Sequence, residues 1–322
     1  MRALVAAPCV GEIGWELMSW QGRVRHVFHR GQFDRLVVLG SAGKSGFYAD
    51  MPLDYRVLDL SALPGSAYED RRFLAQVNEP MPPEAIRERV AGSVERVVGE
   101  LRSGGWAVET LWPAYAGRPW LCDDRFQRFI QFQRPAREAL PTPWVVLVQR
   151  TRGFGMSNWT LADWTRIRDD LHRRGIHTSV FPCESEAAIE ALSACDLAMG
   201  QSTGGLHLAA LCGCPALVWA AASHRWASWE LTNRQRYETW WNPLGSLVQV
   251  YEVGRLPSPQ TAAECVVHAL HTIGRRTGSE AGCLAMRVKW WMRTQLARRV
   301  IQTRAYATWP WPIQRFVRYQ LV

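Results

Sequence analysis

The stretch 196–222, DLAMGQSTGGLHLAALCGCPALVWAAA, constrains the fold of this chain more than any other. It begins with a short apolar run at 197–199, which predicts a buried strand of a parallel sheet. A turn at 200–205 leads into a helix of small apolar residues at 206–211, and Gly213 ends that helix. A second apolar run then predicts another buried strand. A strand, glycine-bearing turn, helix and strand in this order are typical of the right-handed crossover of an α/β fold.

The turn of this unit has the residues of a phosphate-binding loop. Ser202 and Thr203 are favourable helix N-caps, and Gly204 and Gly205 leave backbone N–H groups uncovered at a helix N-terminus. Such an end carries partial positive charge and unpaired donors, and His207 follows in the first helical turn. The same residues also suit an ordinary crossover turn whose small side chains serve packing alone.

The stretch resembles the donor-binding turn of heptosyltransferase-type glycosyltransferases (glycosyltransferase family 9), which have the GT-B architecture. In that family an acidic residue, Thr, Gly, two variable positions and His precede an apolar helix, a Gly-x-Pro and a buried strand. Thr203, Gly204, His207 and the run Gly213-Cys214-Pro215 match this pattern, and Ser202 stands where the family has Asp. The resemblance implies that the donor diphosphate is bound by Ser202, Thr203, Gly204, Gly205 and His207.

Two carboxylates follow the first predicted strand, at 1–8. Glu12 and Glu16 lie in a glycine-bearing turn and the helix it opens, beyond the carboxyl end of that strand, where open α/β sheets place ligands. Acidic residues also favour helix N-termini for purely structural reasons. The resembling family has Gly-Asp here, with Asp as general base. The resemblance therefore implies that Glu12 is the catalytic base, with Glu16 as second choice.

A second crossover series begins with the apolar run 144–149. Arg150, Thr151 and Arg152 leave its end and enter a glycine-rich loop, before Thr160 caps a helix. Guanidinium groups bind phosphate bidentately, so these residues are candidate diphosphate ligands, although solvated loop arginines are equally consistent with the pattern. In the resembling family, this loop supplies hydroxyl and basic contacts to the donor phosphates.

Three further residues are candidate ligands of the donor nucleoside or sugar. Asn158 stands where the resembling family has Lys, before Trp159. Glu184 follows the predicted strand 177–182, at the place where the family contacts the nucleoside, although acids also favour the helix N-terminus there. His224 follows the end of a predicted strand and is expected to flank the cleft.

The two crossover series predict two Rossmann-like domains facing a cleft, followed by a helical extension. We place an acceptor domain at 1–138, a donor domain at 139–275 and a basic aromatic tail at 276–322. Residues 275–322 carry ten Arg and Lys against one Glu, so the whole net charge of +9 resides there. A basic helix bearing Trp at 281–304 suits an anionic membrane surface. It suits a nucleic-acid backbone as well, or a structural role packed on the first domain.

Composition narrows the remaining possibilities. No run of about 18 apolar residues predicts a membrane-spanning helix, and the N-terminus reads as a strand rather than a signal peptide. None of the eight cysteines forms a CxxC pair, which predicts free thiols in a reducing cytoplasm and no zinc site. No paired-aspartate motif follows a predicted strand. We therefore expect no metal and no cofactor beyond the nucleotide-sugar substrate.

Together with the resemblance, these patterns indicate an inverting, metal-independent bacterial glycosyltransferase. Its expected acceptor is a lipid-linked or lipopolysaccharide-type glycan, and its expected location is the cytoplasm or the inner face of the cytoplasmic membrane. Two alternatives stay open: a glycosyltransferase that modifies nucleic acid, and a non-catalytic module that binds nucleotide-sugar or membrane. The sequence does not identify the sugar, the nucleotide base, the individual acceptor or the oligomeric state, and it does not distinguish inversion from retention at the anomeric carbon.

Overall fold

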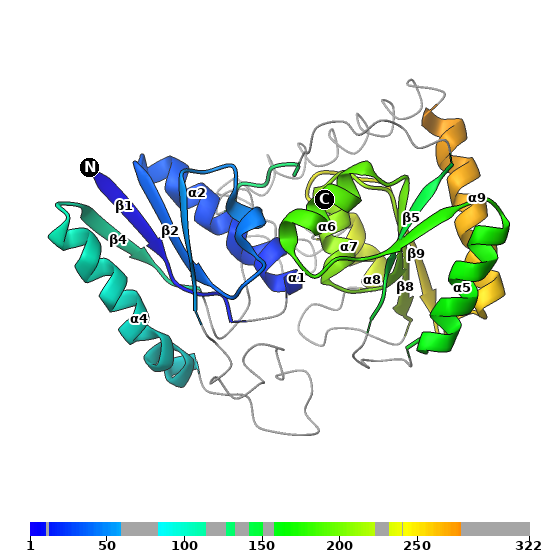
Figure 1. Ribbon diagram of the computed structural model, residues 1–322, viewed down its shortest axis with the longest axis horizontal. Coiled ribbons are helices and arrows are strands. Elements are labelled where there is room, and N and C mark those ends of the chain that lie inside the picture. Colours follow the sequence, from blue (N-terminus) through cyan, green and yellow to red (C-terminus); the bar gives the residue numbers. More distant parts are fainter. Residues whose placement is uncertain are drawn as a thin grey trace, which may run out of the picture.

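The computed structural model describes residues 1–10, 13–58, 83–113, 127–132, 142–150, 158–222, 232–239 and 241–277. Within these ranges the chain forms two α/β units, each built on a parallel sheet (Figure 1). This confirms the predicted pair of parallel-sheet units. The expected tail at 276–322 lies almost wholly outside the described residues, as do the expected roles of 281–304.

The first unit has a four-stranded sheet with strand order β3-β2-β1-β4. Its elements are β1 (Arg2–Ala6), α1 (Ile13–Trp15), the π-helix η1 (Glu16–Trp20), α2 (Gln21–Gly31), β2 (Arg35–Gly40), the 3₁₀-helix η2 (Ser45–Tyr48), β3 (Leu53–Val57), α4 (Pro83–Ser103) and β4 (Ala107–Leu111). Every pairing is parallel, with Leu4 opposite Leu36 in the β1–β2 register. The chain builds β2 and β3 on one side of β1 and β4 on the other.

The buried side chains of β1 alternate between two helical layers. Ala3 and Val5 pack with the face of α4 that carries Val94 and Leu101. Leu4 and Ala6 belong to the cluster that includes residues of η1 and α2 on the opposite face. This alternation follows from the two-residue period of a strand, and it buries the sheet on both sides.

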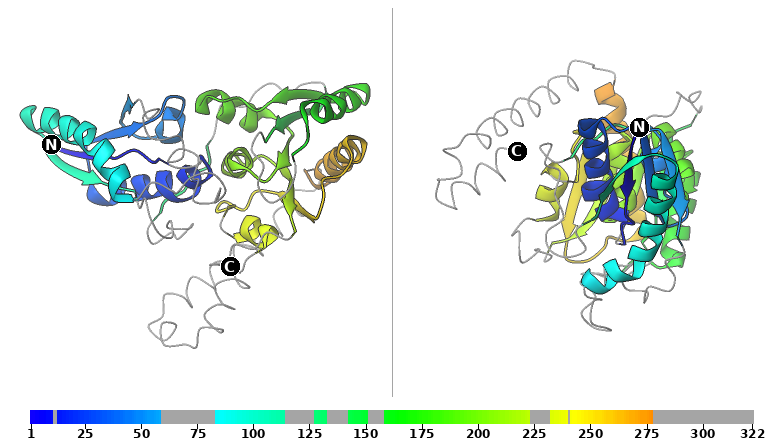
Figure 2. Two further views of the ribbon diagram at one scale, coloured as in Figure 1. Left: turned by 90° about the horizontal axis from the view of Figure 1, so that it is seen from below. Right: turned by 90° about the vertical axis from the view of Figure 1, so that its left-hand side faces the viewer.

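The second unit has a five-stranded sheet with strand order β6-β5-β7-β8-β9. Its elements are β5 (Trp144–Val148), α5 (Leu161–Arg173), β6 (His177–Val180), α6 (Ser185–Ala194), β7 (Leu197–Gln201), α7 (Gly204–Leu211), β8 (Ala216–Ala221), α8 (Asn233–Thr239), β9 (Val248–Val253) and α9 (Pro259–Thr277). Helices α5 and α9 cover one face of the sheet, and α6 and α7 cover the other (Figure 2). All eight residues of α7 are buried, which explains its apolar sequence.

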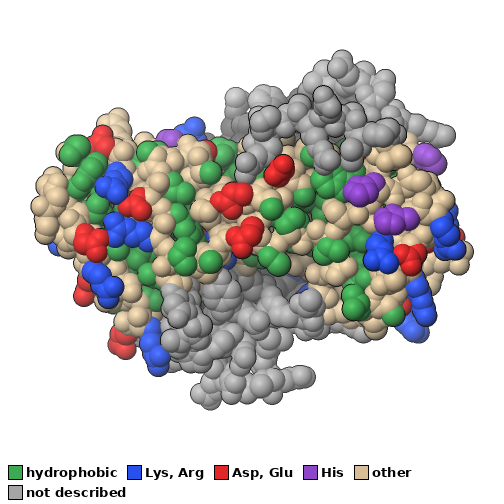
Figure 3. All heavy atoms as spheres, in the orientation of Figure 1, with side chains coloured by type: hydrophobic (Ala, Val, Ile, Leu, Met, Phe, Trp, Pro, Cys, Tyr) green, Lys and Arg blue, Asp and Glu red, His purple; other side chains and the backbone are tan. Residues whose placement is uncertain are grey.

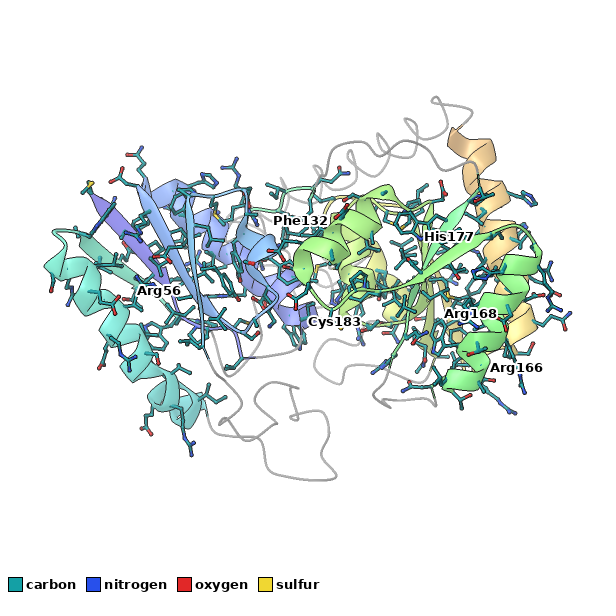
Figure 4. All side chains as sticks on the ribbon, viewed as in Figure 1. Arg56, Phe132, Arg166, Arg168, His177 and Cys183 are labelled. Atoms are coloured by element: carbon teal, nitrogen blue, oxygen red, sulfur yellow. The ribbon has the colours of Figure 1, made fainter. Side chains whose placement is uncertain are left out.

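The segment 127–132 bridges the two units. The Arg128 N–H donates to the Gly22 carbonyl in α2 at 2.8 Å, and the Phe132 N–H donates to the Leu211 carbonyl in α7 at 2.9 Å. The Phe132 ring lies 6.2 Å from that of Phe47 and is labelled between the units in Figure 4. A single hydrophobic cluster therefore runs through both units, which fixes how their sheets face one another.

On the face shown in Figure 3, cationic and anionic side chains are interspersed at both ends of the molecule, and several acidic side chains gather near its middle. This agrees with a sequence whose first 274 residues carry equal numbers of acidic and basic side chains. Among the described residues, no helix is both long enough and apolar enough to cross a membrane.

Candidate functional site

The second sheet has a topological switch point between β5 and β7. The chain passes from β5 to β6 on one side and then returns to place β7 on the other side of β5, so the helices that follow β5 and β7 cover opposite faces. Ligands of open α/β sheets bind at the carboxyl ends of the strands at such a point. Arg150 follows β5 and Ser202 follows β7, and the Arg150 guanidinium donates to the Ser202 carbonyl at 3.0 Å. The structure thus brings together two parts of the predicted diphosphate site.

Some of the backbone donors at the start of α7 are used in hydrogen bonds within the protein, and others are not. The Ser202 N–H donates to the Trp219 carbonyl in β8, and the N–H groups of Leu206 and His207 donate to the Thr203 carbonyl. The N–H groups of Gly204 and Gly205 have no hydrogen-bond partner among the residues that the structure describes. These two donors lie at the positive end of the α7 dipole, as an anion site requires.

The structure corrects two details of the predicted turn. Thr203 is the N-cap residue, but its side chain makes no capping bond, and the Ser202 hydroxyl lies 3.3 Å from the Tyr237 hydroxyl. The Ser202 N–H, expected to face a phosphate, is used in bonding to β8. Strand β8 and helix α8 thus supply partners for Ser202 from elsewhere in the chain.

Both glycines of the turn are required by close packing as well. A Cβ on Gly204 would lie 2.2 Å from Ile13 Cγ2 of α1, and a Cβ on Gly205 would lie 2.7 Å from Val148 Cγ1 of β5. Close packing therefore explains why neither position has room for a Cβ atom. Both glycines are buried, and neither N–H group has a hydrogen-bond partner among the described residues, so close packing at their Cα atoms does not by itself exclude anion binding.

His207 is a buried, neutral imidazole beside this turn. It is 7% exposed, and its ring lies 4.5 Å from Trp241 and 5.4 Å from Tyr237. Burial, with a smaller contribution from Arg236, lowers its pKa to about 3. Neither ring nitrogen has a hydrogen-bond partner within the described part of the chain. A neutral imidazole offers one donor and one acceptor, which matches a hydroxyl group better than a phosphate.

The first unit meets the second at the carboxyl ends of both sheets. Segment α1 contacts α7, where a Cβ on Gly14 would lie 2.8 Å from His207 Nδ1. The turn after β2 contacts the start of α6: the Ser185 N–H donates to the Gly43 carbonyl at 2.8 Å, and the Gly46 N–H donates to Ser185 Oγ at 2.9 Å. The ligand-binding edges of the two sheets therefore face one another.

Glu184 lies at this same contact. Its side chain is exposed, and a Cβ on Gly43 would lie 2.5 Å from its Oε2 atom. The structure thus places Glu184 between the two units, where the predicted role in nucleoside binding stays a prediction. Asn158 accepts a hydrogen bond from the Gln201 side chain at 3.2 Å, which puts it at the carboxyl end of β7.

Glu16 has a structural environment rather than that of a catalytic base. It is 3% exposed in η1, it forms an ion pair with Lys44, and it accepts a hydrogen bond from the Tyr48 hydroxyl at 3.0 Å. Both of its carboxylate oxygens are bonded within the first unit, so this carboxylate is not presented to an acceptor hydroxyl. The first-choice base, Glu12, lies outside the described residues, as do Thr151, Arg152 and His224.

Three residues next to the turn have no counterpart in the sequence-based prediction. Arg236 and Tyr237 belong to α8, and Trp241 lies just beyond it. Their only sequence signal is a Trp-dense stretch without helical periodicity, because they face α7 through tertiary packing. As for metals, no three His, Cys, Asp or Glu side chains form a group that could hold an ion within the described ranges.

No protein-family model matches the chain, and no curated protein does either. Several solved structures are similar. ADP-heptose lipopolysaccharide heptosyltransferase II of E. coli is 13% identical with a TM-score of 0.45, over 84% of this chain and 99% of that one. A glycosyl transferase family 9 protein of Veillonella parvula is 11% identical with a TM-score of 0.46, over 84% of this chain and 96% of that one. The E. coli heptosyltransferase WaaC with ADP is 12% identical with a TM-score of 0.42, over 85% and 100%. These proteins are of the class that the sequence resembles, at identities that do not by themselves establish membership.

Proposed function

We propose that this chain is a glycosyltransferase that moves a sugar from a nucleotide-sugar donor to a hydroxyl group of a glycan acceptor. One observation carries the proposal. At the switch point of the second sheet, the N–H groups of Gly204 and Gly205 stand at the positive end of a buried helix, beside the Arg150 guanidinium. Backbone donors at a helix N-terminus and a guanidinium group both favour phosphate oxygens.

The surroundings of this anion site suit a sugar attached to a diphosphate. His207, one helical turn further along α7, is neutral and has both donor and acceptor capacity toward a sugar hydroxyl. The opposing sheet edge carries the connection after β1, and Glu12 immediately precedes Ile13, the residue packed against Gly204. In the proposal, Glu12 is the general base of the reaction, as the sequence resemblance implies.

The proposed reaction is a direct displacement. Glu12 takes the proton of the acceptor hydroxyl, the acceptor oxygen bonds to the anomeric carbon, and the bond from that carbon to the diphosphate oxygen breaks. The electron pair leaves with the nucleoside diphosphate, whose charge is stabilised by Arg150 and the start of α7. Attack from the face opposite the leaving group inverts the anomeric configuration. Because fixed positive charge meets the leaving group, the proposal assigns no step to a metal ion.

The acceptor is proposed on the sequence resemblance alone. It is a lipid-linked or lipopolysaccharide-type glycan, and the basic segment 281–322 would hold the enzyme to an anionic membrane surface on the cytoplasmic side. Sedimentation with anionic liposomes tests this part separately, by comparing the full chain with a variant that lacks 281–322. Equal sedimentation of the two proteins would remove the membrane proposal and leave the transferase proposal intact.

A thermal-shift screen against nucleoside diphosphates and their sugars tests the activity. A ligand present at about 100 times its Kd stabilises the folded state by about 2.7 kcal/mol, a rise in Tm of several degrees. Arg150→Ala should raise the Kd of the nucleotide about tenfold or more, because the substitution removes charge-assisted hydrogen bonds. Arg168→Ala is the matched control, since Arg168 lies on the outer surface of α5 and pairs with Asp169 (Figure 4). No shift with any nucleotide, or equal losses in both variants, would overturn the proposal.

A further inference from the structure

A cluster contributed by α8 lies behind the predicted donor turn, and the sequence assigns it no role. We call Arg236, Tyr237 and Trp241 the α8 cluster; their exposed fractions are 0%, 1% and 6%. Within the cluster, the Arg236 guanidinium lies 5.0 Å from the Trp241 ring centroid, and the Tyr237 ring meets the Trp241 ring at 5.1 Å, nearly edge-on. Burial of the two aromatic rings is favourable, whereas burial of the Arg236 charge costs free energy that the contact with the Trp241 ring offsets in part.

Tyr237 contacts the donor turn at Ser202 and the helix that follows it at His207. Its hydroxyl lies 3.3 Å from Ser202 Oγ, within hydrogen-bonding distance. Its ring lies 5.4 Å from the His207 ring, and the Trp241 ring lies 4.5 Å from the same imidazole in a tilted arrangement. One side chain thus holds the backbone that leads into the two glycine donors and also the imidazole that follows them.

The environment of the Tyr237 hydroxyl is positively charged. Burial raises the pKa of this phenol, whereas Arg150 and Arg236 both act to lower it, together with the bonds from Ser202 and Thr203. The phenol is therefore neutral at physiological pH and keeps its proton as a donor. Burial lowers the pKa of Arg236 to about 9, which leaves this guanidinium charged at neutral pH. Two cations thus stand near the hydroxyl that anchors the turn, a distribution that favours an anion in front of it.

We propose that Tyr237 is a positioning residue of the donor site. Its hydroxyl fixes the Ser202–Thr203 turn so that the Gly204 and Gly205 N–H groups are held toward the donor diphosphate, and its ring fixes the orientation of His207. The inference rests on the proposed function, because it concerns the same site. It goes further in assigning α8, which neither the sequence nor the turn itself identifies, to the machinery that binds the nucleotide.

The test compares Tyr237→Phe with a matched control, Tyr251→Phe. Phenylalanine keeps the ring of residue 237 and removes only the hydroxyl. Tyr251 is the appropriate control because its ring stacks on Trp219 and its hydroxyl accepts a bond from the Gln249 side chain, in the layer beneath α9. ADP, GDP, UDP and CDP are titrated into each protein by calorimetry at 20 °C, well below the unfolding temperature.

For the nucleotide that binds the wild type, we expect Tyr237→Phe to raise the Kd by about threefold to tenfold. This is the net contribution of one hydrogen bond. Tyr251→Phe should bind as the wild type does. A purely structural hydroxyl would lower Tm and leave Kd at 20 °C unchanged, and that result would overturn the inference while the proposed function stands. Absence of binding by all four diphosphates to the wild type would instead defeat the proposed function, and the inference with it.

The Ser202→Ala variant gives a second measurement that does not depend on how Tyr237→Phe folds. If the Tyr237 hydroxyl acts through the turn, the Ser202→Ala/Tyr237→Phe double variant binds nucleotide about as weakly as Tyr237→Phe alone, because the two changes disrupt one contact. Independent, multiplicative losses in Kd would show that Tyr237 acts by another route and would contradict the positioning role.

Discussion

Replacement of Lys44 by methionine removes the cation of the buried ion pair with Glu16. The side chains of Glu16 and Lys44 are only 3% and 10% exposed, so water cannot take the place of the ammonium group. The carboxylate would keep one described partner, the Tyr48 hydroxyl at 3.0 Å. Loss of one member of a buried pair costs about 3–5 kcal/mol. Because the phenol bond remains, we expect the lower end, about 3 kcal/mol in the free energy of unfolding.

Urea denaturation followed by tryptophan fluorescence measures this loss. Glu16→Gln should cost a similar amount, since it leaves the ammonium group buried without its counterion. The Glu16→Gln/Lys44→Met double variant leaves no buried charge and keeps an acceptor for Tyr48, so it should be at least about 2 kcal/mol more stable than the sum of the single losses predicts. Arg56→Met, at the exposed pair with Glu100, is the control and should cost under about 1 kcal/mol. A Lys44→Met loss equal to that of Arg56→Met, or a strictly additive double variant, would refute the reasoning.

Three further outcomes follow from the packing and the ionisable groups. Gly204→Ala places a Cβ 2.2 Å from Ile13 Cγ2, and the forced shift should lower the free energy of unfolding by about 1–3 kcal/mol; an unchanged urea midpoint would contradict this. Because the folded pKa of His207 is about 3, unfolded His207 binds a proton that the native state excludes as pH falls from about 6.5. The wild type should therefore lose up to about 1.4 kcal/mol per pH unit relative to His207→Asn between pH 6 and 4, whereas parallel stability curves would argue against a buried neutral imidazole. The exposed Cys183 should react with a thiol reagent in the native protein and the 3% exposed Cys214 only after unfolding, and peptide mapping that found the reverse order would show the burial to be wrong.

The crossover unit at 196–222 is the part of the fold that local sequence predicts best. Strands β7 and β8 are buried along their whole length, and a strand buried on both faces reads as a continuous apolar run. The start of helix α5 was predicted equally well: Thr160 is the N-cap as expected, and the structure adds a reciprocal capping box with Asp163. In both cases the signal and the structure that it specifies lie within a few residues of each other.

Elements stabilised by distant partners were not predictable in this way. The edge strand β9 is half exposed and lacks a continuous apolar run, and the seven-residue helix α8 has a largely polar sequence, NRQRYET. The π-helix η1 interrupts a stretch whose apolar spacing predicts an ordinary helix, although its inward residues, such as Leu17, are buried as expected.

One part of the candidate site could be predicted from the sequence, and another part could not. The pairing of Arg150 with the turn at Ser202 follows from a general rule, that the carboxyl ends of neighbouring parallel strands share one edge of the sheet. Two other contacts depend on how separate elements pack: the burial of Lys44 against Glu16 and the contact of Tyr237 with Ser202. Residue types and their spacing do not predict such packing. Lys44 in particular lies in a glycine-bearing turn whose sequence, SAGKSG, lacks the spacing of a phosphate-binding loop.

The amide resonances of Gly204 and Gly205 test the central claim most directly. Selective labelling with ¹⁵N-glycine limits the spectrum to the 25 glycines of the chain, and a nucleoside diphosphate identified in the thermal-shift screen is then titrated into the protein. If these two N–H groups bind the diphosphate, their signals shift downfield and saturate at the Kd found by calorimetry, while Gly175, at the far end of α5, stays in place. Tight nucleotide binding that leaves the Gly204 and Gly205 signals unmoved would contradict the account.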